Sequence, residues 1–393
     1  MINRMAHRIL SLALTLSAGL ALAQDGATCQ YGDFLFHPSE AGMEICGYTG
    51  TDTYVILPEY IDDGSGRNAV VSIGEEAFYG SRFETVVIPA SIRKIGPLAF
   101  CNSRNLRRAV LPPTLQTVCN DAFALCRSLR AVVFPDSVAV IPWMVLGEAQ
   151  NVETVVLGRG VRSIGPGFLT GDYSVKEIYI MSPEPPELVS ADSECGRFGP
   201  FHQMSMPDVY VPAESLGMYA ARPSDRHSMH CDWESQGSWD YFYRYKPIPD
   251  LFTVMYDTEL TVSPETPVAI GYETVNYAGV GVYSEEWTSS DAAVATVSDG
   301  IVTGHADGSA TVSLSVRTDS GVYSSRPCVV TVEGASPLKK RRSSAGIPEI
   351  GAEGEEEAVY TLDGVKVGSS CDDLEPGCYI VKKGSSCRKI VMI

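Results

Sequence analysis

A seven-residue phrase recurs every 23 residues in the first half of the chain. It reads Phe-Glu-Thr-Val-Val-Ile-Pro from Phe83, Leu-Arg-Arg-Ala-Val-Leu-Pro from Leu106 and Leu-Arg-Ala-Val-Val-Phe-Pro from Leu129. Two less regular copies start at Val152 and Val175. A fixed period of this length is typical of a solenoid, in which each repeat packs only on its neighbours. The sequence therefore predicts a stack of 23-residue coils.

Each coil offers several large apolar residues to a shared interior. The alternation of side chains along a strand predicts which residues of the phrase point inward. A second inward position follows at Ile73 and its equivalents, and a third is a column of phenylalanines. The inward residues are Val86, Ile88, Ala109, Leu111, Val155, Leu157, Ile178 and Ile180, then Ile73, Ile95, Val118, Ile141 and Ile164, and finally Phe78, Phe100, Phe123, Leu146 and Phe168.

The outward residues of the same strands carry the functional information. One outward row is almost entirely valine, and its neighbour contains Arg108 and Glu177. A straight apolar row on an exposed sheet is either a device that stabilises strand stacking or a contact surface. Both alternatives stay open at this point. The candidate binding residues are Val87, Val110, Val133, Val156, Tyr179, Arg108 and Glu177.

The repeats resemble the BspA-type leucine-rich repeats of bacterial surface proteins. The phrases Val-Ser-Ile-Gly-Glu-Glu-Ala-Phe from Val71 and Lys-Ile-Gly-Pro-Leu-Ala-Phe from Lys94 are similar to that family's consensus. The resemblance covers residues 31–248 and implies a repeat domain that adheres to host or partner-cell surfaces. The outward position that holds valine here is commonly threonine in the family.

Residues beyond Pro249 alternate as short strands separated by turn signals, which predicts a β-sandwich. The stretch from Glu286 to Val312 resembles the bacterial immunoglobulin-like group 2 domain, which implies a spacer or adhesive module. Asp299-Gly300 is typical of a tight turn between strands, and Trp287 is expected in the core. The expected strands are 258–262, 268–272, 286–288, 293–297, 301–303, 310–316 and 328–332.

The two ends of the chain predict export. Arg4 and Arg8 precede an apolar run that ends in Ala-Leu-Ala23, which is typical of a cleaved signal peptide. The tail resembles the C-terminal domain that type IX secretion recognises in Bacteroidota, although its end lacks the usual lysine. The fold is expected to be mostly β, ordered as a signal peptide (1–23), a repeat domain with an N-terminal cap (24–248), an immunoglobulin-like domain (249–334), a flexible linker (335–357) and a C-terminal sorting-like β unit (358–393).

Charge and composition exclude several classes of function. Removing the signal peptide leaves 28 basic and 48 acidic residues, a net charge of −20. Such a chain repels nucleic acid and anionic lipid. No later stretch is long and apolar enough to span a bilayer. Motifs for a nucleophile elbow, a phosphate loop, a dinucleotide site and a zinc protease are missing from the sequence, so we expect neither an enzyme nor a cofactor.

The eleven cysteines all belong to the mature chain. An odd number leaves one thiol free or paired between chains in an oxidising compartment. Cys29 and Cys46 are the expected local pair, and Cys195 with Cys231 is a second candidate. A third would join two of Cys371, Cys378 and Cys387. His227, His230 and Cys231 lack a second ligand pair at metal-site spacing, so no metal is expected.

These observations favour an extracellular or cell-surface protein that binds a protein or glycan on host or neighbouring cells; the periplasm is the alternative location. One functional alternative is a surface or matrix component that associates with its own kind. Another is carbohydrate binding, with Trp233, Trp239 and Tyr241 as a stacking platform.

Overall fold

The structure is a computed structural model of the 393-residue chain. It describes residues 28–62, 66–189, 191–193, 196–198, 200–201, 206–220, 245–264 and 266–334, and four strands between 357 and 392. The proposed signal peptide and all but the last residue of the proposed linker lie outside these residues.

A small antiparallel sheet closes the first coil. Strands β1 (Cys29–Tyr31), β2 (Phe34–Ser39) and β3 (Gly42–Tyr48) pair in this order. Strand β3 also pairs in parallel with β6 (Arg67–Ile73), and β6 pairs antiparallel with β5 (Tyr60–Asp62). The rings of Phe34 and Tyr48 lie 6.5 and 6.0 Å from that of Phe78. The cap therefore covers an apolar end that has no neighbouring coil.

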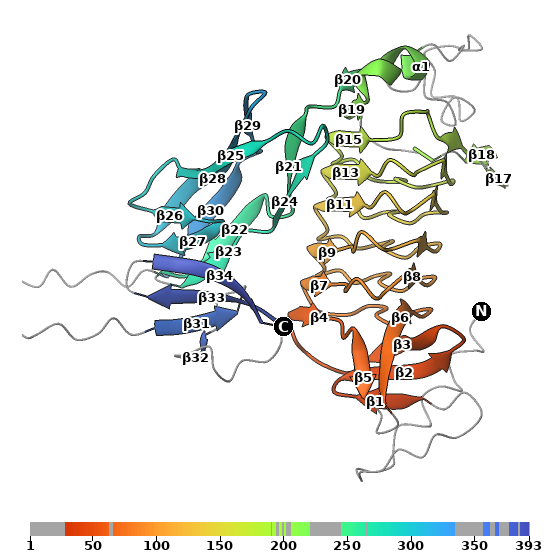
Figure 1. Cartoon of the computed structure of the whole chain (residues 1–393), viewed down its shortest axis with the longest axis horizontal. Coiled ribbons are helices and arrows are strands. Elements are labelled where there is room, and N and C mark those ends of the chain that lie inside the picture. Colours follow the sequence, from red (N-terminus) through yellow and green to blue (C-terminus); the bar gives the residue numbers. More distant parts are fainter. Residues whose placement is uncertain are drawn as a thin grey trace, which may run out of the picture.

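The coils stack with the predicted period (Figure 1). In the regular coils the parallel pairing joins residues 23 apart, as in Val86 with Ala109 and Thr154 with Glu177, and the steps at the two ends of the stack are longer. We call the outward surface of this ladder the strand face. Its strands are β4 (Tyr54–Ile56), β7 (Thr85–Val87), β9 (Arg108–Val110), β11 (Ala131–Phe134), β13 (Thr154–Leu157), β15 (Glu177–Ile180), β19 (Asp208–Val211) and β20 (Tyr245–Pro247).

A second set of short parallel strands forms another side of the coils, which we call the lateral sheet. Its register again advances by 23 residues from Lys94 to Thr117 and from Val140 to Ser163. Its strands are β8 (Lys94–Ile95), β10 (Thr117–Val118), β12 (Val140–Ile141), β14 (Ser163–Ile164) and β16 (Glu187–Leu188).

The last coil is followed by irregular structure. The described elements there are β17 (Ala191–Ser193), β18 (Gly196–Phe198), the 3-10 helix Ala213–Ser215 and the one-turn helix α1 (Leu216–Ala220). None of the helices in the described part of the chain is long and apolar enough to cross a membrane.

The predicted interior of the coils is confirmed. All the inward residues are buried except Leu111, which is partly buried against the core. The rings of Phe78, Phe100 and Phe123 stack in parallel with centroids 5.1 Å apart. One contiguous core therefore runs from the cap to the last coil.

We expect Phe100→Ala to lower the free energy of unfolding by about 3–5 kcal/mol. Phe100 is fully buried between two stacked rings, so the shortened side chain leaves a cavity that neighbouring coils cannot close. Urea denaturation followed by circular dichroism measures the loss. The exposed Tyr79→Ala is the control, with a change below about 1 kcal/mol.

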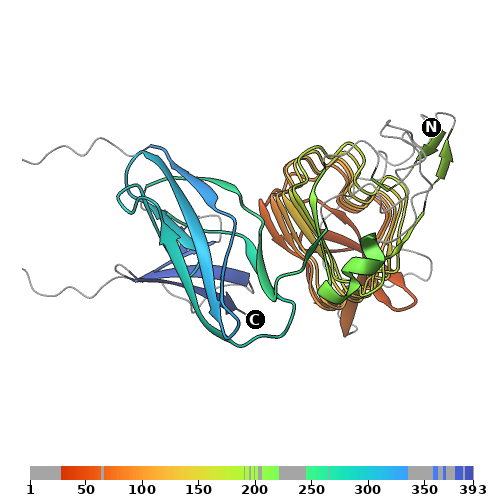
Figure 2. The same ribbon diagram turned by 90° about the horizontal axis from the view of Figure 1, so that it is seen from above.

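Residues 251–332 form a β-sandwich domain beside the coils (Figure 2). Its main sheet has the order β22-β30-β28-β25, and β29 also pairs with β28. The smaller sheets are β23-β27-β26 and β21-β24. The strands are β21 (Leu251–Met255), β22 (Glu259–Val262), β23 (Pro267–Ala269), β24 (Tyr272–Asn276), β25 (Val282–Ser289), β26 (Ala295–Ser298), β27 (Ile301–Gly304), β28 (Gly308–Thr318), β29 (Val322–Ser324) and β30 (Cys328–Val332).

The sandwich confirms two local predictions and corrects one. Asp299 and Gly300 have φ angles of 49° and 74°, as a two-residue turn between β26 and β27 requires. Trp287 is partly buried and packs against the sandwich core beside Tyr272, with ring centroids 5.1 Å apart. The strand expected over 268–272 is instead divided between β23 and β24, with Ile270 and Gly271 between them, and β21 and β29 have no counterpart among the expected strands.

The tail is a small β unit, as expected. Strands β31 (Glu357–Thr361), β32 (Lys366–Gly368), β33 (Gly377–Lys383) and β34 (Ser386–Met392) form a sheet in the order β32-β31-β33-β34. Strand β34 contacts β27 of the sandwich.

Among the described side chains, the structure contains cysteine thiols and no disulfide. Cys46 is half-buried; burial raises the pKa of its thiol, and the nearby Cys29 adds to the rise. The predicted pair are thus neighbours, but no S–S bond joins them in this structure. Cys195 and Cys231 lie outside the described residues.

Candidate functional site: the strand face of the coils

The strand face holds all seven candidate binding residues, because the 23-residue register aligns equivalent positions of successive coils. Val156 and Tyr179 are 0 % and 6 % exposed. The other five are partly buried. These candidate residues point away from the core of the coils, yet they are largely shielded from solvent. The sandwich domain packs against this face.

An apolar cluster joins the strand face to β21 and β24. Tyr179 is the centre of a three-ring stack, 4.5 Å from Tyr210 and 3.9 Å from Phe252 of the sandwich. Burial raises the pKa of Tyr179 well above its ordinary value, and the Glu177 carboxylate adds to the rise. The cluster comprises Ala131, Val133, Val156, Tyr179, Met181, Tyr210, Ile248, Phe252, Val254, Tyr256, Val275 and Tyr277.

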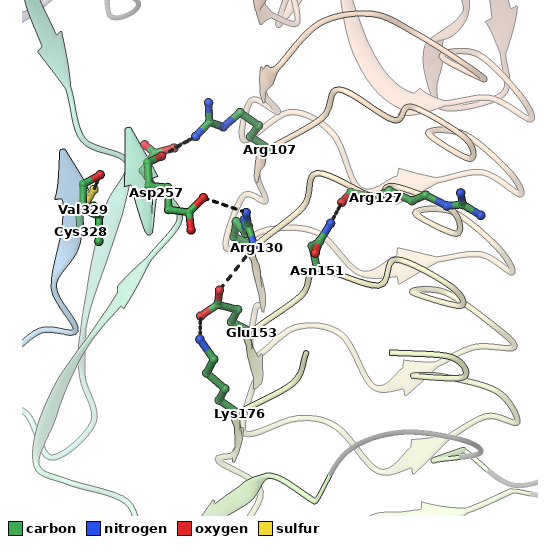
Figure 3. Close-up of polar contacts among 10 residues, drawn as sticks. Arg107, Arg127, Arg130, Asn151, Glu153, Lys176, Asp257, Cys328 and Val329 are labelled. Atoms are coloured by element: carbon green, nitrogen blue, oxygen red, sulfur yellow. Dashed lines mark hydrogen bonds and ion pairs between the residues drawn. The ribbon is translucent and has the colours of Figure 1, made fainter. Parts of the chain in front are cut away.

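Arginines of the coils meet acidic groups of the sandwich beside this cluster (Figure 3). Arg107 donates a 2.7 Å hydrogen bond to the Glu259 carbonyl, and its guanidinium lies 3.7 Å from the Asp257 carboxylate. Arg130 lies 3.7 Å from the Glu259 carboxylate. The charges on the two surfaces are thus complementary at this end of the contact.

At the other end the signs are reversed, around Glu153. Its carboxylate is 12 % exposed and has three cations within 4 Å: Arg130 at 3.5 Å and Lys176 at 2.5 Å from the coils, and Arg326 at 3.6 Å from the sandwich. Arg326 also lies 3.1 Å from Glu177. Glu153 therefore links Arg130 and Lys176 of the coils on either side of it (Figure 3), and through Arg326 it also contacts the second domain.

Gly271 marks the closest approach of the sandwich backbone to Arg108. A Cβ atom at this position would overlap the Arg108 guanidinium and lie 2.9 Å from Asp257 Oδ2. The absence of a side chain at this residue allows the close approach, and a larger residue there would require Arg108 to move. The Arg108 Nε is buried and has no hydrogen-bond partner among the described residues.

The connection between the domains is itself part of the coil ladder. β20 pairs in parallel with β19, with Tyr210 opposite Lys246, and the Ile248 N–H donates a 2.9 Å hydrogen bond to the Val211 carbonyl. Three residues separate the end of β20 at Pro247 from the start of β21 at Leu251. This short connection directs Phe252 onto Tyr179.

Five of the seven candidate residues thus contact the chain's own sandwich domain. Val133, Val156 and Tyr179 contact it in the apolar cluster, and Arg108 and Glu177 meet Gly271 and Arg326. Val87 and Val110 lie on the same face outside the cluster. Their role toward an external partner stays a prediction, and contact at the covered positions would require the domains to separate.

The sequence analysis missed the charged column next to the valine row. Arg107, Arg130, Glu153 and Lys176 occupy one position of four successive coils, 23 residues apart. Charge at the same position in four coils is the signal that could have located them.

Several other candidate residues cannot be placed. The aromatic platform of Trp233, Trp239 and Tyr241, and the group His227, His230 and Cys231, lie outside the described residues. Within the described residues no three His, Cys, Asp or Glu side chains form a group that could hold a metal ion.

Residues 71–184 match the family of the BspA type leucine rich repeat region, in six copies, and residues 258–324 match the bacterial Ig-like domain (group 2). No curated protein matches the chain.

Solved leucine-rich repeat proteins are similar to part of the chain. A leucine rich repeat protein of T. pallidum is 31% identical, with 39% of this chain and 71% of that chain covered and a TM-score of 0.36. One from Bacteroides capillosus is 21% identical (39% and 99% covered, TM-score 0.30). A leucine rich cell surface protein from Faecalibacterium prausnitzii is 16% identical (48% and 65% covered, TM-score 0.31). By the two family matches, residues 71–184 are a BspA-type leucine-rich repeat region and residues 258–324 are a bacterial immunoglobulin-like domain of group 2.

Proposed function

We propose that this chain is an exported surface protein that binds a protein partner. The observation that carries the proposal is the combination of an export signal with leucine-rich repeats and an immunoglobulin-like domain. The strand face supports it by showing that these coils form a protein contact, because it buries an apolar row and complementary charges against the sandwich domain. An external partner would bind the coil surfaces that the sandwich leaves open. Both matched families are typically binding modules without enzymatic activity.

The proposed location is the outer cell surface, after cleavage at residue 23. In this proposal residues 24–248 are one domain, 249–334 a second, and 335–357 a linker to a sorting unit at 358–393. The signal sequence and the similarity to a cell surface protein support this arrangement. Adhesion to host or neighbouring cells is the specific role that we propose for the binding.

Binding is tested with the mature full-length chain and immobilised matrix glycoproteins, each probed intact and after enzymatic removal of its glycans. Saturable binding that survives glycan removal supports protein recognition. Binding that disappears with the glycans supports the carbohydrate alternative, and concentration-dependent assembly of the pure chain with no ligand bound supports the self-associating alternative.

Location is tested by fractionating cells that express the chain with and without residues 358–393. We expect the full-length protein on the outer surface and the shortened protein in the periplasm. Retention of the full-length protein in the periplasm would contradict the surface role.

A further inference from the structure

The immunoglobulin-like domain has two features that a freely swinging spacer lacks. It is attached by three residues to a strand that belongs to the coil ladder. It also covers the coils along several repeats, from Arg107 at one end to Tyr210 at the other (Figure 1).

The apolar part of the contact is too large to expose without cost. Opening would transfer Val156, Tyr179, Phe252, Val254 and Tyr256 from almost complete burial to water together. A monomeric soluble protein rarely exposes a continuous apolar surface of that kind. The resembled family usually has threonine at the positions of the valine row. Burial against the sandwich domain explains why this chain has apolar side chains there.

The polar part of the contact fixes its register. Arg107 and Arg130 meet Asp257 and Glu259 near one end, and Arg326 meets Glu153 and Glu177 near the other. Because the signs are reversed between the two ends, sliding or inverting the domain would bring like charges together.

We infer that the repeat coils and the immunoglobulin-like domain form one rigid body in solution, and that the strand face is reserved for this internal contact. The covalent connection also stabilises the contact, because a three-residue tether keeps the immunoglobulin-like domain at a high effective concentration near the strand face. An external partner must then use surfaces that the domain leaves open. This inference does not depend on which partner the chain binds.

Hydroxyl-radical footprinting of the unmutated mature chain tests the inference with a matched pair of tyrosines. Tyr173 and Tyr179 lie six residues apart, and their exposed fractions are 64% and 6%. We expect Tyr179 to be oxidised about tenfold more slowly than Tyr173, in proportion to these fractions. Equal oxidation rates of the two rings would overturn the inference.

The source of the protection is tested by the double variant Phe252→Asp/Arg326→Glu, which places negative charge against Tyr179, Glu153 and Glu177. We expect the oxidation rate of Tyr179 to approach that of Tyr173. Tyr219, fully buried against the coils themselves, should stay protected and reports that they remain folded. Unchanged protection of Tyr179 in this variant would show that the domain is not its cover, and would contradict the inference.

If the double variant unfolds, Tyr219 becomes oxidised as well, and Val254→Asp serves instead. It places a carboxylate in the apolar cluster between the two domains, where Val254 is 1 % exposed, without altering the aromatic stack. A rise in Tyr179 oxidation of several-fold, with Tyr219 still protected, supports the inference, and no rise contradicts it.

Discussion

Glu153→Lys is expected to separate the immunoglobulin-like domain from the coils and to lower the free energy of unfolding by about 3–5 kcal/mol. Among the described residues, the substitution removes the one carboxylate that has all three cations, Arg130, Lys176 and Arg326, within 4 Å. It leaves four cations in a site where the wild-type carboxylate is 12 % exposed. Urea denaturation measures the stability, and small-angle scattering of residues 24–334 measures the separation.

The repeat itself provides the control for this variant. Glu84 occupies the same position of an earlier coil and is exposed, so Glu84→Lys should change stability by less than about 1 kcal/mol. Adding Arg326→Glu to the Glu153→Lys variant should restore part of the lost stability, because the reversed pair again attracts. Equal effects of Glu84→Lys and Glu153→Lys would contradict the role of Glu153.

The second large effect concerns Asp172, a fully buried carboxyl group in the turn of the last regular coil. Its Oδ1 accepts a 2.6 Å hydrogen bond from the Gln150 N–H, and its Oδ2 has no hydrogen-bond partner within the described part of the chain. Burial raises its pKa from 3.8 to about 8; nearby Glu148 adds to the rise, and the Gln150 N–H opposes it.

The raised pKa predicts that the protein loses stability as the pH increases. Between pH 4 and 8 the folded chain holds a proton on Asp172 that the unfolded chain has released, so each step up in pH favours unfolding. The loss ends near pH 8, where the folded form also ionises. A shift of this size corresponds to roughly 6 kcal/mol across the whole range.

Asp172→Asn should flatten this part of the pH dependence and make the chain more stable than wild type at pH 8. Asp172→Ser should behave alike, since Ser103 occupies the equivalent position and donates a hydrogen bond to the Phe78 carbonyl. Urea midpoints at pH 5, 6.5 and 8 measure the slopes. Identical slopes in wild type and both variants would exclude Asp172 as their source.

The sequence was sufficient to predict the interior of the coils. A 23-residue period can be satisfied only if Val86, Ala109 and their equivalents meet in register, because each coil has no other neighbour on which to bury its apolar residues. The turn at Asp299-Gly300 was equally predictable, since a left-handed backbone at both positions suits this pair of residues.

The cover of the strand face was not predictable by the same reasoning. The alternation of side chains along the strand predicts that Val156 points away from the core of its coil. It does not predict which other part of the chain packs against Val156. Strand β21 was missed for a related reason: Leu251 and Met255 pack into the sandwich while Phe252 and Val254 pack on the coils. With apolar residues on both sides, the segment has no period of two to detect.

The ladder strand β20 also limits how this protein can evolve. Repeat arrays ordinarily gain and lose units freely, since each unit contacts only its neighbours. Here the second domain is anchored at one end of the stack and bonded to Arg107 several coils away. Inserting or deleting one unit between them would displace Arg107 from Asp257 by about 5 Å, the spacing of adjacent strands. The number of units between Arg107 and β20 is therefore fixed by the domain that lies across them.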